Sequence, residues 1–241
     1  MNISRMMQIA AAGGEELINS VTNTDNDSGT GLVNSATFTS AALNLGTVPE
    51  GFETRTIVVL FSCTATGTVP TLSSATLGGV AMTARLFRAP TAGTVHVVHG
   101  SFTLDVPSGT SADFVLNFGA SISRFGRAVS VYSVKNFDTF LSAANTGLTT
   151  SISKAVTLPS GGTNVVASFI AGASTNMTVK PSLVAEFGLM NLAIDGVDIG
   201  NDEYVSHGHI FIESAALPVD TTFATTGTTD GSMLDTTTLA E

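Results

Sequence analysis

Residues 55–137 carry the clearest pattern in this chain, in which short segments of alternating apolar residues are closed by turns rich in Gly and Pro. It contains R-T-I-V-V-L-F-S (55–62), S-A-T-L-G-G-V-A-M-T (74–83), V-H-V-V-H-G-S-F-T-L-D-V-P-S-G-T-S-A-D-F-V-L-N-F (95–118) and G-R-A-V-S-V-Y-S-V-K-N-F (126–137). Alternation with a period of two residues is typical of strands, and turns about every eight to twelve residues favour an antiparallel sandwich or barrel over a βαβ fold. The stretch therefore predicts an all-β chain, folded as an antiparallel β-sandwich of the jelly-roll or Ig-like kind.

Individual segments predict how such a sandwich is built. Residues 57–61 are apolar at every position, so we expect a central strand that is covered on both faces. Residues 77–80, L-G-G-V, are a signal for a two-residue hairpin, and residues 107–110, P-S-G-T, are expected to close a second one. In the strands that follow, the alternation puts Phe114, Leu116 and Phe118 on one face, then Val129 and Val131 on one face and Tyr132 and Val134 on the other.

The two ends of the chain differ in composition from its middle. Residues 1–34 are interpreted as an extended N-terminal arm that docks on a partner, with a short helix over 6–21 and a linker over 23–31, N-T-D-N-D-S-G-T-G. The alternative is a frayed terminus. The sandwich domain is expected over 35–220, and the Thr-rich residues 221–241 are expected to form an extended or loosely attached tail.

The second half of the domain follows the same pattern less regularly. Residues 165–170 and 204–214 are expected to be strands. Residues 182–192 fit either a strand or a short helix, and residues 195–202 are expected to be a loop.

Charge is scarce in this chain and excludes several partners. Only 12% of the 241 residues are charged, against roughly 25% in an average soluble domain, and the net charge is −10. Lysine is confined to Lys135, Lys154 and Lys180, so there is no basic face for nucleic acid or for anionic lipid heads. Since surface charge keeps monomers apart, we expect much of this surface to be covered in the working state.

The termini and the cysteine content bear on the compartment. The first 16 residues hold one basic residue, a weak apolar run and two glutamates, which does not fit a signal peptide. No apolar run approaches the roughly 18 residues of a membrane span. Cys63 is the only cysteine, so no disulfide framework is expected, and a cytoplasmic origin fits best.

The succession of strands and turns resembles a known module. The marks are T-L-G-G-V-A-M-T (76–83), V-P-S-G-T (106–110) with D-F-V-L-N-F (113–118), A-V-S-V-Y (128–132) and T-L-P-S-G-G-T-N-V-V-A-S-F (157–169). Over about two thirds of the chain they resemble a β-sandwich module of structural proteins from tailed bacteriophages and related prophages. The resemblance implies a part of the virion, without saying which part, and it carries over no catalytic residue.

Histidines are the first candidates for a metal site. His96 and His99 are three residues apart on a strand, so they point to opposite faces and are not expected to share a metal. His207 and His209 are two apart and point the same way, as a metal pair requires. Val205 and Phe211 share that face and no third ligand is evident, so a structural pair is the alternative.

Acidic residues give a second metal hypothesis. Residues 195–203, D-G-V-D-I-G-N-D-E, form an acidic segment with glycines, and calcium binds several oxygens from one flexible loop. The spacing does not match the EF-hand pattern, so a solvated hairpin loop is the favoured interpretation. Asp25 and Asp27 are weaker candidates of the same kind. We therefore assign no metal or cofactor.

Catalytic motifs are not recognisable. No G-x-S-x-G sequence follows a strand and precedes a helix, and Cys63 is interpreted as a small core residue. The absence of Trp and the presence of only Tyr132 and Tyr204 leave little aromatic platform for a sugar. Arg124 and Arg127 fit either contacts with a neighbouring copy or ordinary loop arginines.

These observations lead to a hypothesis about function. The chain is expected to be a non-enzymatic structural protein of a tailed-phage virion, with a capsid-decorating or cementing role favoured because no coiled-coil heptads predict a fibre shaft. Its partners would be other copies of itself and the major capsid or tail proteins. The alternatives are a tail or tail-fibre component and a module that binds a host-surface glycan or protein, through loops such as 64–74 and 195–203. An enzyme acting on polysaccharide is a third hypothesis.

Overall fold

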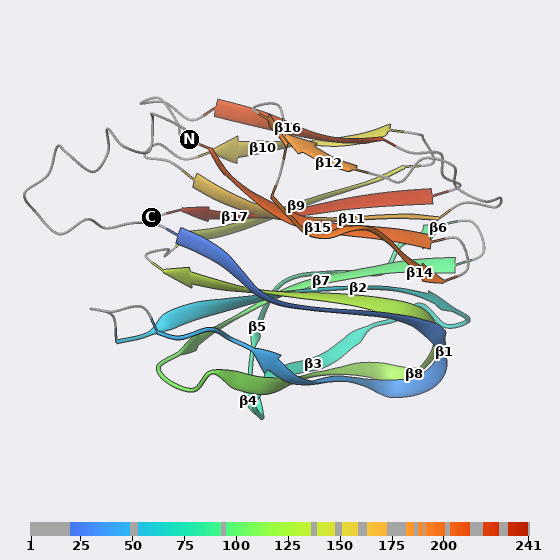
Figure 1. The fold of residues 1–241 in the computed structure, drawn as a ribbon. Coiled ribbons are helices and arrows are strands. Elements are labelled where there is room, and N and C mark those ends of the chain that lie inside the picture. Colours follow the sequence, from blue (N-terminus) through green and yellow to red (C-terminus); the bar gives the residue numbers. More distant parts are fainter. Residues whose placement is uncertain are drawn as a thin grey trace, which may run out of the picture.

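The computed structural model shows an all-β protein (Figure 1). It describes residues 20–48, 53–92, 95–135, 139–147, 151–158, 163–172, 182–185, 188–189, 191–200, 203–212, 219–226 and 231–240. Within these ranges every regular element is a strand and every strand pairing is antiparallel. The all-β, antiparallel prediction is confirmed.

The first half of the chain forms one sheet. Its strands are β1 (Ser20–Asn44), β2 (Arg55–Thr66), β3 (Leu72–Leu77), β4 (Val80–Ala81), β5 (Thr83–Arg88), β6 (Thr91–Ala92), β7 (Val95–Val106) and β8 (Ser111–Lys135). The order is β4-β3-β8-β2-β7-β5, with β1 paired to β8 and β6 paired to β7. We call this the β1–β8 sheet.

Strands β1 and β8 fold this sheet back on itself. The start of β8 pairs with β3, and its end, from Ser123 onward, pairs with β2. Between these parts the register with β1 jumps, because Thr37 pairs with Asn117 whereas Ser35 pairs with Ile122. The extra residues in β8 bend the ribbon, and Figure 1 shows β1 and β8 curving together at one end of the molecule.

The folded-back sheet encloses an apolar core. Phe61 of β2 lies 4.9 Å from Phe38 of β1 and 6.4 Å from Phe118 of β8, measured between ring centroids. Phe102 of β7 and Phe114 of β8 lie 5.7 Å apart. The other buried members are Leu43, Leu45, Ile57, Val59, Cys63, Ala65, Ala75, Leu77, Val98, Leu116, Ile122, Val129 and Val131. Cys63 is thus a small core residue, as predicted.

The second half of the chain forms two further sheets. One has the order β14-β15-β11-β17-β9, and the other has the order β10-β16-β12-β13. Their strands are β9 (Thr139–Gly147), β10 (Ser151–Leu158), β11 (Thr163–Gly172), β12 (Ser182–Ala185), β13 (Gly188–Leu189), β14 (Asn191–Gly200), β15 (Glu203–Ile212), β16 (Val219–Thr226) and β17 (Gly231–Ala240). Figure 1 shows the three sheets stacked, with the β9–β11–β14–β15–β17 sheet, which we call the middle sheet, lying over β2, β7 and β8.

Strand β2 is therefore covered on both faces, as its apolar sequence predicts. Val58 and Leu60 point away from the large core and pack with Tyr132 and Val134 of β8. Ala193 of β14 packs against the same small cluster, so it lies at the contact between the β1–β8 sheet and the middle sheet. The predicted face assignments in β8 are confirmed, because Val129 and Val131 lie in the large core and Tyr132 and Val134 in the small one.

A buried arginine fastens three chain segments at one end of the first sheet. Arg55 opens β2 and is 1% exposed. Its Nε donates a hydrogen bond to the carbonyl oxygen of Leu45 at 3.1 Å, and its NH2 donates to those of Gly46 at 3.0 Å and Gly109 at 2.6 Å. Burial lowers the pKa of Arg55. One guanidinium thus holds the end of β1 and the β7–β8 turn against β2.

Of the two predicted hairpins, one is confirmed and one is wrong. Leu77 pairs with Val80, and Gly78 and Gly79 have φ of 57° and 80°, as the central residues of a type I′ turn require. Residues 107–110 do not close a hairpin, because β7 and β8 flank β2 on opposite sides and do not pair with each other. Both strands pair with β2 instead. A turn motif depends on a few neighbouring residues, so it does not determine which strands pair with each other.

The interpretation of residues 20–34 as part of an arm is corrected. They form the first part of β1, and residues 23–31, taken for a linker, pair with β8 from Asn23 opposite Tyr132 to Gly29 opposite Arg127. Polar residues typical of loops here satisfy their side chains by hydrogen bonds within β1, such as that from Asn23 Nδ2 to the carbonyl oxygen of Asp25. Residues 1–19, with most of the predicted helix, lie outside the described residues.

The C-terminal residues are also more integrated than expected. Strand β17 pairs with β11 on one side and β9 on the other, so it lies inside the middle sheet, and the expectation of loose attachment is wrong. Thr is β-branched and suits a strand, which explains how a Thr-rich segment pairs so extensively. Residues 195–200, predicted as a loop, belong to β14, which pairs with β15 through several register shifts. In 182–192 the described elements are strands.

Candidate functional site

The most concentrated chemistry lies buried between the β1–β8 sheet and the middle sheet. Ser62 of β2 places its Oγ 2.6 Å from Nδ1 of His99 on β7 and 2.8 Å from Nε2 of His207 on β15. Ser130 of β8 places its Oγ 2.9 Å from Nδ1 of the same His207. All four side chains are buried, and we call them the Ser–His cluster.

The alternation of each strand explains why these side chains meet. Ser62 continues the face of Val58 and Leu60, which is turned away from the large core. His99 lies on the opposite face of β7 from Val98 and Phe102, which belong to that core. His96 shares the parity of Val98, so the prediction that His96 and His99 point to opposite faces agrees with the structure.

A serine hydroxyl beside an imidazole nitrogen is the arrangement used in nucleophilic catalysis. Here Ser62 and His207 are fully buried and His99 is 1% exposed, so bulk solvent and a substrate do not reach the hydroxyl. Burial lowers the pKa of His207 well below 6.5, and the neighbouring His99 lowers it further. The cluster therefore holds a neutral imidazole between two hydroxyls and joins the layers.

His209, two residues along β15, points to the same side as His207, as predicted. Its ring lies 5.5 Å from that of Tyr132 in an edge-on arrangement. Burial lowers the pKa of His209 and raises that of Tyr132. The two aromatic rings extend the contact between the layers from the Ser–His cluster toward the small apolar cluster.

This geometry favours the structural interpretation of the His207 and His209 pair. Both ring nitrogens of His207 lie within hydrogen-bond distance of serine hydroxyls. The described residues contain no group of three or more His, Cys, Asp or Glu that could hold a metal ion. Nothing is described of the side chains of residues 195–203, so the calcium hypothesis for that segment stays a prediction.

His96 also has a structural place. Its Nε2 lies 2.9 Å from the carbonyl oxygen of Gly67, and its Nδ1 lies 3.2 Å from Oγ1 of Thr91. It thus connects the start of β7 to β6 and to the chain that follows β2. No local sequence pattern indicates the contact with Gly67, which is 29 residues away.

Arg124 and Arg127 lie within β8 and not in a loop before a strand. Arg124 is buried, with its guanidinium carbon 5.0 Å from the ring centroid of Phe38, a cation–π contact. Burial lowers the pKa of Arg124; Cys63 opposes this effect and Arg127 adds to it. The interpretation of Arg124 as a contact to a neighbouring copy does not fit its burial.

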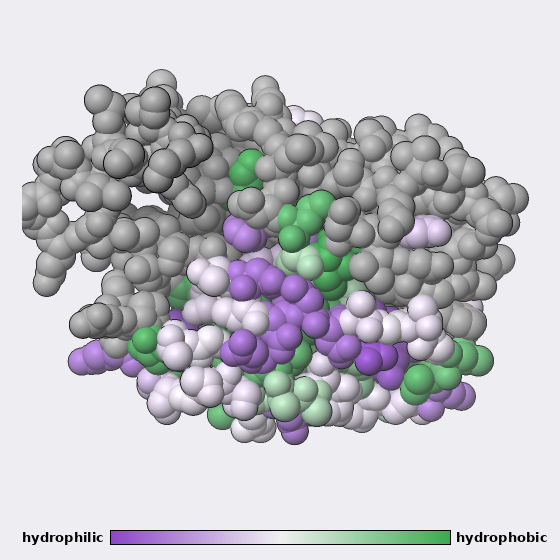
Figure 2. Space-filling model, viewed as in Figure 1, coloured by the Kyte–Doolittle hydropathy of each residue, from purple (hydrophilic) through white to green (hydrophobic). Residues whose placement is uncertain are grey.

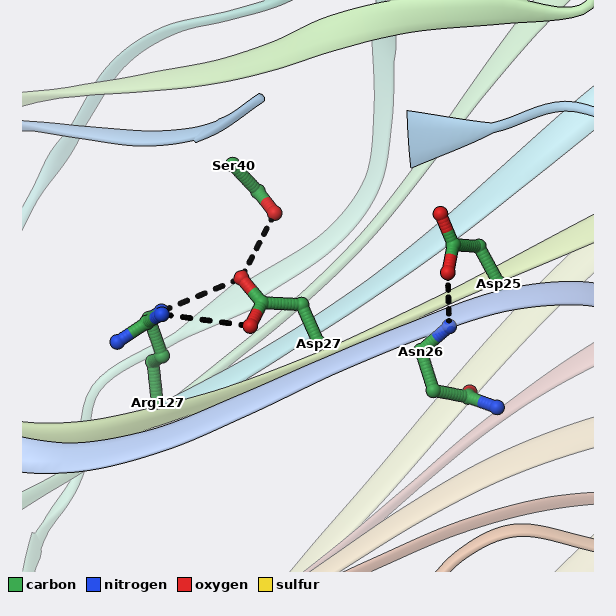
Figure 3. Close-up of polar contacts among 5 residues, drawn as sticks. All are labelled: Asp25, Asn26, Asp27, Ser40 and Arg127. Carbon is green, nitrogen blue, oxygen red and sulfur yellow. Dashed lines mark hydrogen bonds and ion pairs between the residues drawn. The ribbon is translucent and has the colours of Figure 1, made fainter. Parts of the chain in front are cut away.

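Arg127 and two acidic residues of β1 form a partly exposed polar group. Arg127 NH2 lies 3.3 Å from Oδ1 of Asp27, and Ser40 Oγ donates to Oδ2 of Asp27 at 2.8 Å. Figure 3 shows Ser40 and Arg127 converging on this carboxylate, with Asp25 bound to the amide of Asn26. The other oxygen of Asp25 accepts from the amide of Asn44 at 2.6 Å. The carboxylates that were weak calcium candidates thus join the two ends of the curled β1.

The described surface carries a few large apolar side chains. The exposed large hydrophobic residues are Leu32, Val33, Val69, Val80 and Leu192. Figure 2 shows hydrophilic residues across the middle of the described surface, residues of intermediate hydropathy around them and small apolar areas toward the edges. Contacts made through these apolar side chains would not depend on charge.

Comparison of the chain with family models, with curated proteins and with solved structures gave no match. No helix among the described residues is long and apolar enough to cross a membrane.

The Ser–His cluster is the feature that sequence reasoning missed. The sequence marks His99 and His207 as candidate site residues, but it does not connect them with Ser62, which lies 37 residues from the first and 145 from the second. The available signal was the break in apolar character on one face of residues 57–64, where Val58 and Leu60 give way to Ser62 and Thr64. That signal marks a polar partner without saying which one.

Proposed function

We propose that this protein is a non-enzymatic structural component of a tailed-phage virion that decorates the capsid. The observation that carries the proposal is the division of the described residues between inside and outside. His96, His99 and His207 are buried and join strands and layers through hydrogen bonds, whereas only 12% of the residues of the chain are charged. The resemblance of the strand and turn succession to phage structural modules supports the same conclusion.

A neutral β-structured surface suits repeated packing for a physical reason. Covering a charged side chain costs much desolvation free energy unless a partner charge meets it, whereas covering uncharged Thr, Ser and Gly surfaces costs less. With 12% charged residues, this chain can bury large areas against other copies and against the shell without building matching ion pairs. This is the property that a cementing protein needs on several sides at once.

The finer architecture belongs to the same proposal. We infer a sandwich of the jelly-roll or Ig-like kind, in which stacked sheets supply rigidity, and a docking arm limited to residues 1–19. The arm is shorter than the sequence suggested because residues 20–34 are committed to β1.

The arm is tested by deleting residues 1–19 and measuring incorporation into particles. The truncation stops before β1, so we expect an unchanged melting temperature and loss of the protein from purified particles. The matched control is Val80→Ser, which alters an exposed apolar residue of β4 and should incorporate normally. Incorporation of the truncated chain at the level of the full chain would show that the arm does not dock the protein.

Capsid decoration is tested by imaging particles that carry a labelled copy of the full chain. We expect regularly arranged density on the head. Density confined to the tail would replace this proposal with a tail or tail-fibre role. Binding of the purified protein to host cells, together with absence from the head, would favour a host-surface binding module.

A further inference from the structure

We propose that Thr24 and Asp25 cap the outer edge of β1 near Asn44 and so prevent a second copy of the chain from pairing with this edge. We call residues 40–44 the capped edge. The proposal concerns pairing between strand edges, and it does not depend on a role in a virion. It rests on the position of the edge, on the direction of its backbone groups and on the side chains that bind them.

Strand β1 lies at one side of the β1–β8 sheet. Within the described residues it pairs with β8 and with no other strand. A strand with a free edge presents N–H and C=O groups that can pair with another chain, and natural sheets protect such edges with bulges and charged side chains. The 25 residues of β1 make this edge long, so its protection affects whether the protein associates with itself.

Asn44 directs its backbone groups to the outer edge. The N–H of Leu45 donates to the carbonyl oxygen of Thr110, on the β8 side, at 2.8 Å. The C=O of Asn44 belongs to the same trans peptide as this N–H and therefore points away from β8. In a strand, the N–H and the C=O of one residue point to the same side, so the N–H of Asn44 also points outward.

Side chains from the start of β1 bind both of these groups. Thr24 Oγ1 donates to the carbonyl oxygen of Asn44 at 2.8 Å, and the amide of Asn44 donates to Oδ2 of Asp25 at 2.6 Å. The other oxygen of Asp25 accepts from the amide of Asn26 at 2.8 Å, which orients the carboxylate (Figure 3). A hydroxyl and a carboxylate thus occupy the positions that the backbone of a neighbouring strand would take.

A bulge precedes Asn44 on the same edge. Between Ser40 and Leu43, two residues of β1 lie opposite one residue of β8, which is Asp113. Ala42 has a φ of 53° within this bulge, and its amide donates to Oδ1 of Asp113 at 2.8 Å. A second amide of the capped edge is therefore bound by a carboxylate, and the bulge interrupts the regular strand that a partner would need.

The occupant that fits the uncapped edge is a second copy of this chain. In an antiparallel pair, two residues that lie directly opposite each other exchange both N–H···O bonds. Asn44 presents one donor and one acceptor on the same edge, so Asn44 of one copy and Asn44 of another satisfy each other around a two-fold axis. Removal of the cap should therefore produce a dimer that pairs through this edge.

The first experiment measures the self-association of full chains by sedimentation at pH 7.5. The variant Thr24→Val/Asp25→Ala removes both capping groups. The matched control is Thr56→Val/Asp105→Ala, which removes the same residue types, the same charge and an exposed hydrogen bond of 2.6 Å on β2 and β7. We expect the edge variant to associate about tenfold or more tightly than the wild type and the control to associate like the wild type. Equal association of the two variants would overturn the proposal.

A conservative variant separates the hydrogen bond from the charge. Asp25→Asn keeps an oxygen that accepts from the amide of Asn44 and removes the negative charge. We expect it to associate like the wild type. If Asp25→Asn associates as tightly as the edge variant, charge repulsion keeps the copies apart and the cap does not.

A measurement on the wild type keeps the proposal testable if the edge variant does not fold. Amide hydrogen exchange is followed at several protein concentrations. We expect the amide of Asn44 to exchange about tenfold or more slowly than in the unfolded chain, at a rate independent of concentration, because the cap belongs to the same molecule. Exchange at the rate of the unfolded chain would show that no cap exists. Protection that grows with protein concentration would show that the edge pairs with a second copy, contrary to the proposal.

Discussion

The two faces of β2 lie in contrasting surroundings. Toward the inside of the β1–β8 sheet, the strand after Arg55 presents apolar side chains, namely Ile57, Val59, Phe61, Cys63 and Ala65. Toward the middle sheet, Val58 and Leu60 give way to Ser62, which contacts two imidazoles. The first face stabilises by removing area from water, an effect that is non-directional and indifferent to protonation. The second face is directional, so it fixes how the layers meet.

The largest expected effect comes from the apolar face. Phe61→Ala removes a fully buried ring that contacts Phe38 and Phe118, and it should lower the free energy of unfolding by about 3–5 kcal/mol. Chemical denaturation at pH 7.5 and at pH 5.5 measures the loss, which should be equal at both values. Val80→Ala, at a site 57% exposed, is the control and should change stability by less than about 0.5 kcal/mol. A loss that differs between the two pH values would show that the contribution of the apolar face depends on protonation, contrary to the comparison above.

The next effect concerns the buried cation at the end of β2. Arg55→Met keeps much of the side-chain volume but leaves the carbonyl oxygens of Leu45, Gly46 and Gly109 without their donor. We expect a loss of about 2–3 kcal/mol, measured by urea denaturation. Arg55→Lys is the matched variant, and it should recover only part of the loss because an ammonium group lacks the planar fork. Full recovery by Lys would show that the charge matters and the geometry does not.

The polar face is probed by Ser62→Ala, which deprives two buried imidazole nitrogens of one hydroxyl. We expect a loss of about 1–3 kcal/mol in the free energy of unfolding at pH 7.5. The neighbouring Cys63→Ser places a hydroxyl on the apolar face of the same strand and should also destabilise, because a buried hydroxyl group loses its hydration. If either variant leaves the free energy of unfolding unchanged, its face of β2 tolerates both polar and apolar side chains, and the contrast between the two faces does not hold.

The smallest effect is expected at the surface. Asp27→Asn removes the ion pair with Arg127, whose side chain is 36% exposed, and keeps an oxygen for Ser40. We expect a loss of about 0.2–1 kcal/mol that shrinks in 1 M salt, because exposed pairs are screened. Thermal unfolding at low and high salt measures it. A larger loss that salt does not change would indicate that Asp27 stabilises the curled β1 mainly through its hydrogen bonds.

Local signals predicted local structure well in this chain. The double-glycine turn at Gly78 and Gly79 needs two positive φ values, which glycine adopts without cost, and it forms as expected. The apolar run of β2 correctly predicted that both faces of this strand are covered. The alternation of β8 correctly placed Tyr132 and Val131 on opposite sides. Each of these signals depends on residues that are neighbours in the sequence.

The predictions that failed required knowledge of partners. Residues 23–31 have a loop composition, yet pairing with β8 along a common ribbon makes them a strand. The Thr-rich end was expected to be extended or loosely attached because it lacks large apolar residues. In the structure, β17 pairs through its backbone with β11 on one side and β9 on the other. Backbone hydrogen bonds to a partner strand are largely independent of side-chain hydrophobicity, so composition underestimates them.

Local patterns of residues were enough to predict that this chain is built of antiparallel strands, which faces of β2 and β8 are apolar, and where the double-glycine turn lies. These properties follow from the two-residue period of a strand and from the conformational freedom of glycine. The position of β2 between β7 and β8, and the contact of Ser62 with a histidine 145 residues away, are visible only in the folded chain. Partner choice depends on closing long loops and on the fit of whole faces, and no short stretch of residues encodes either.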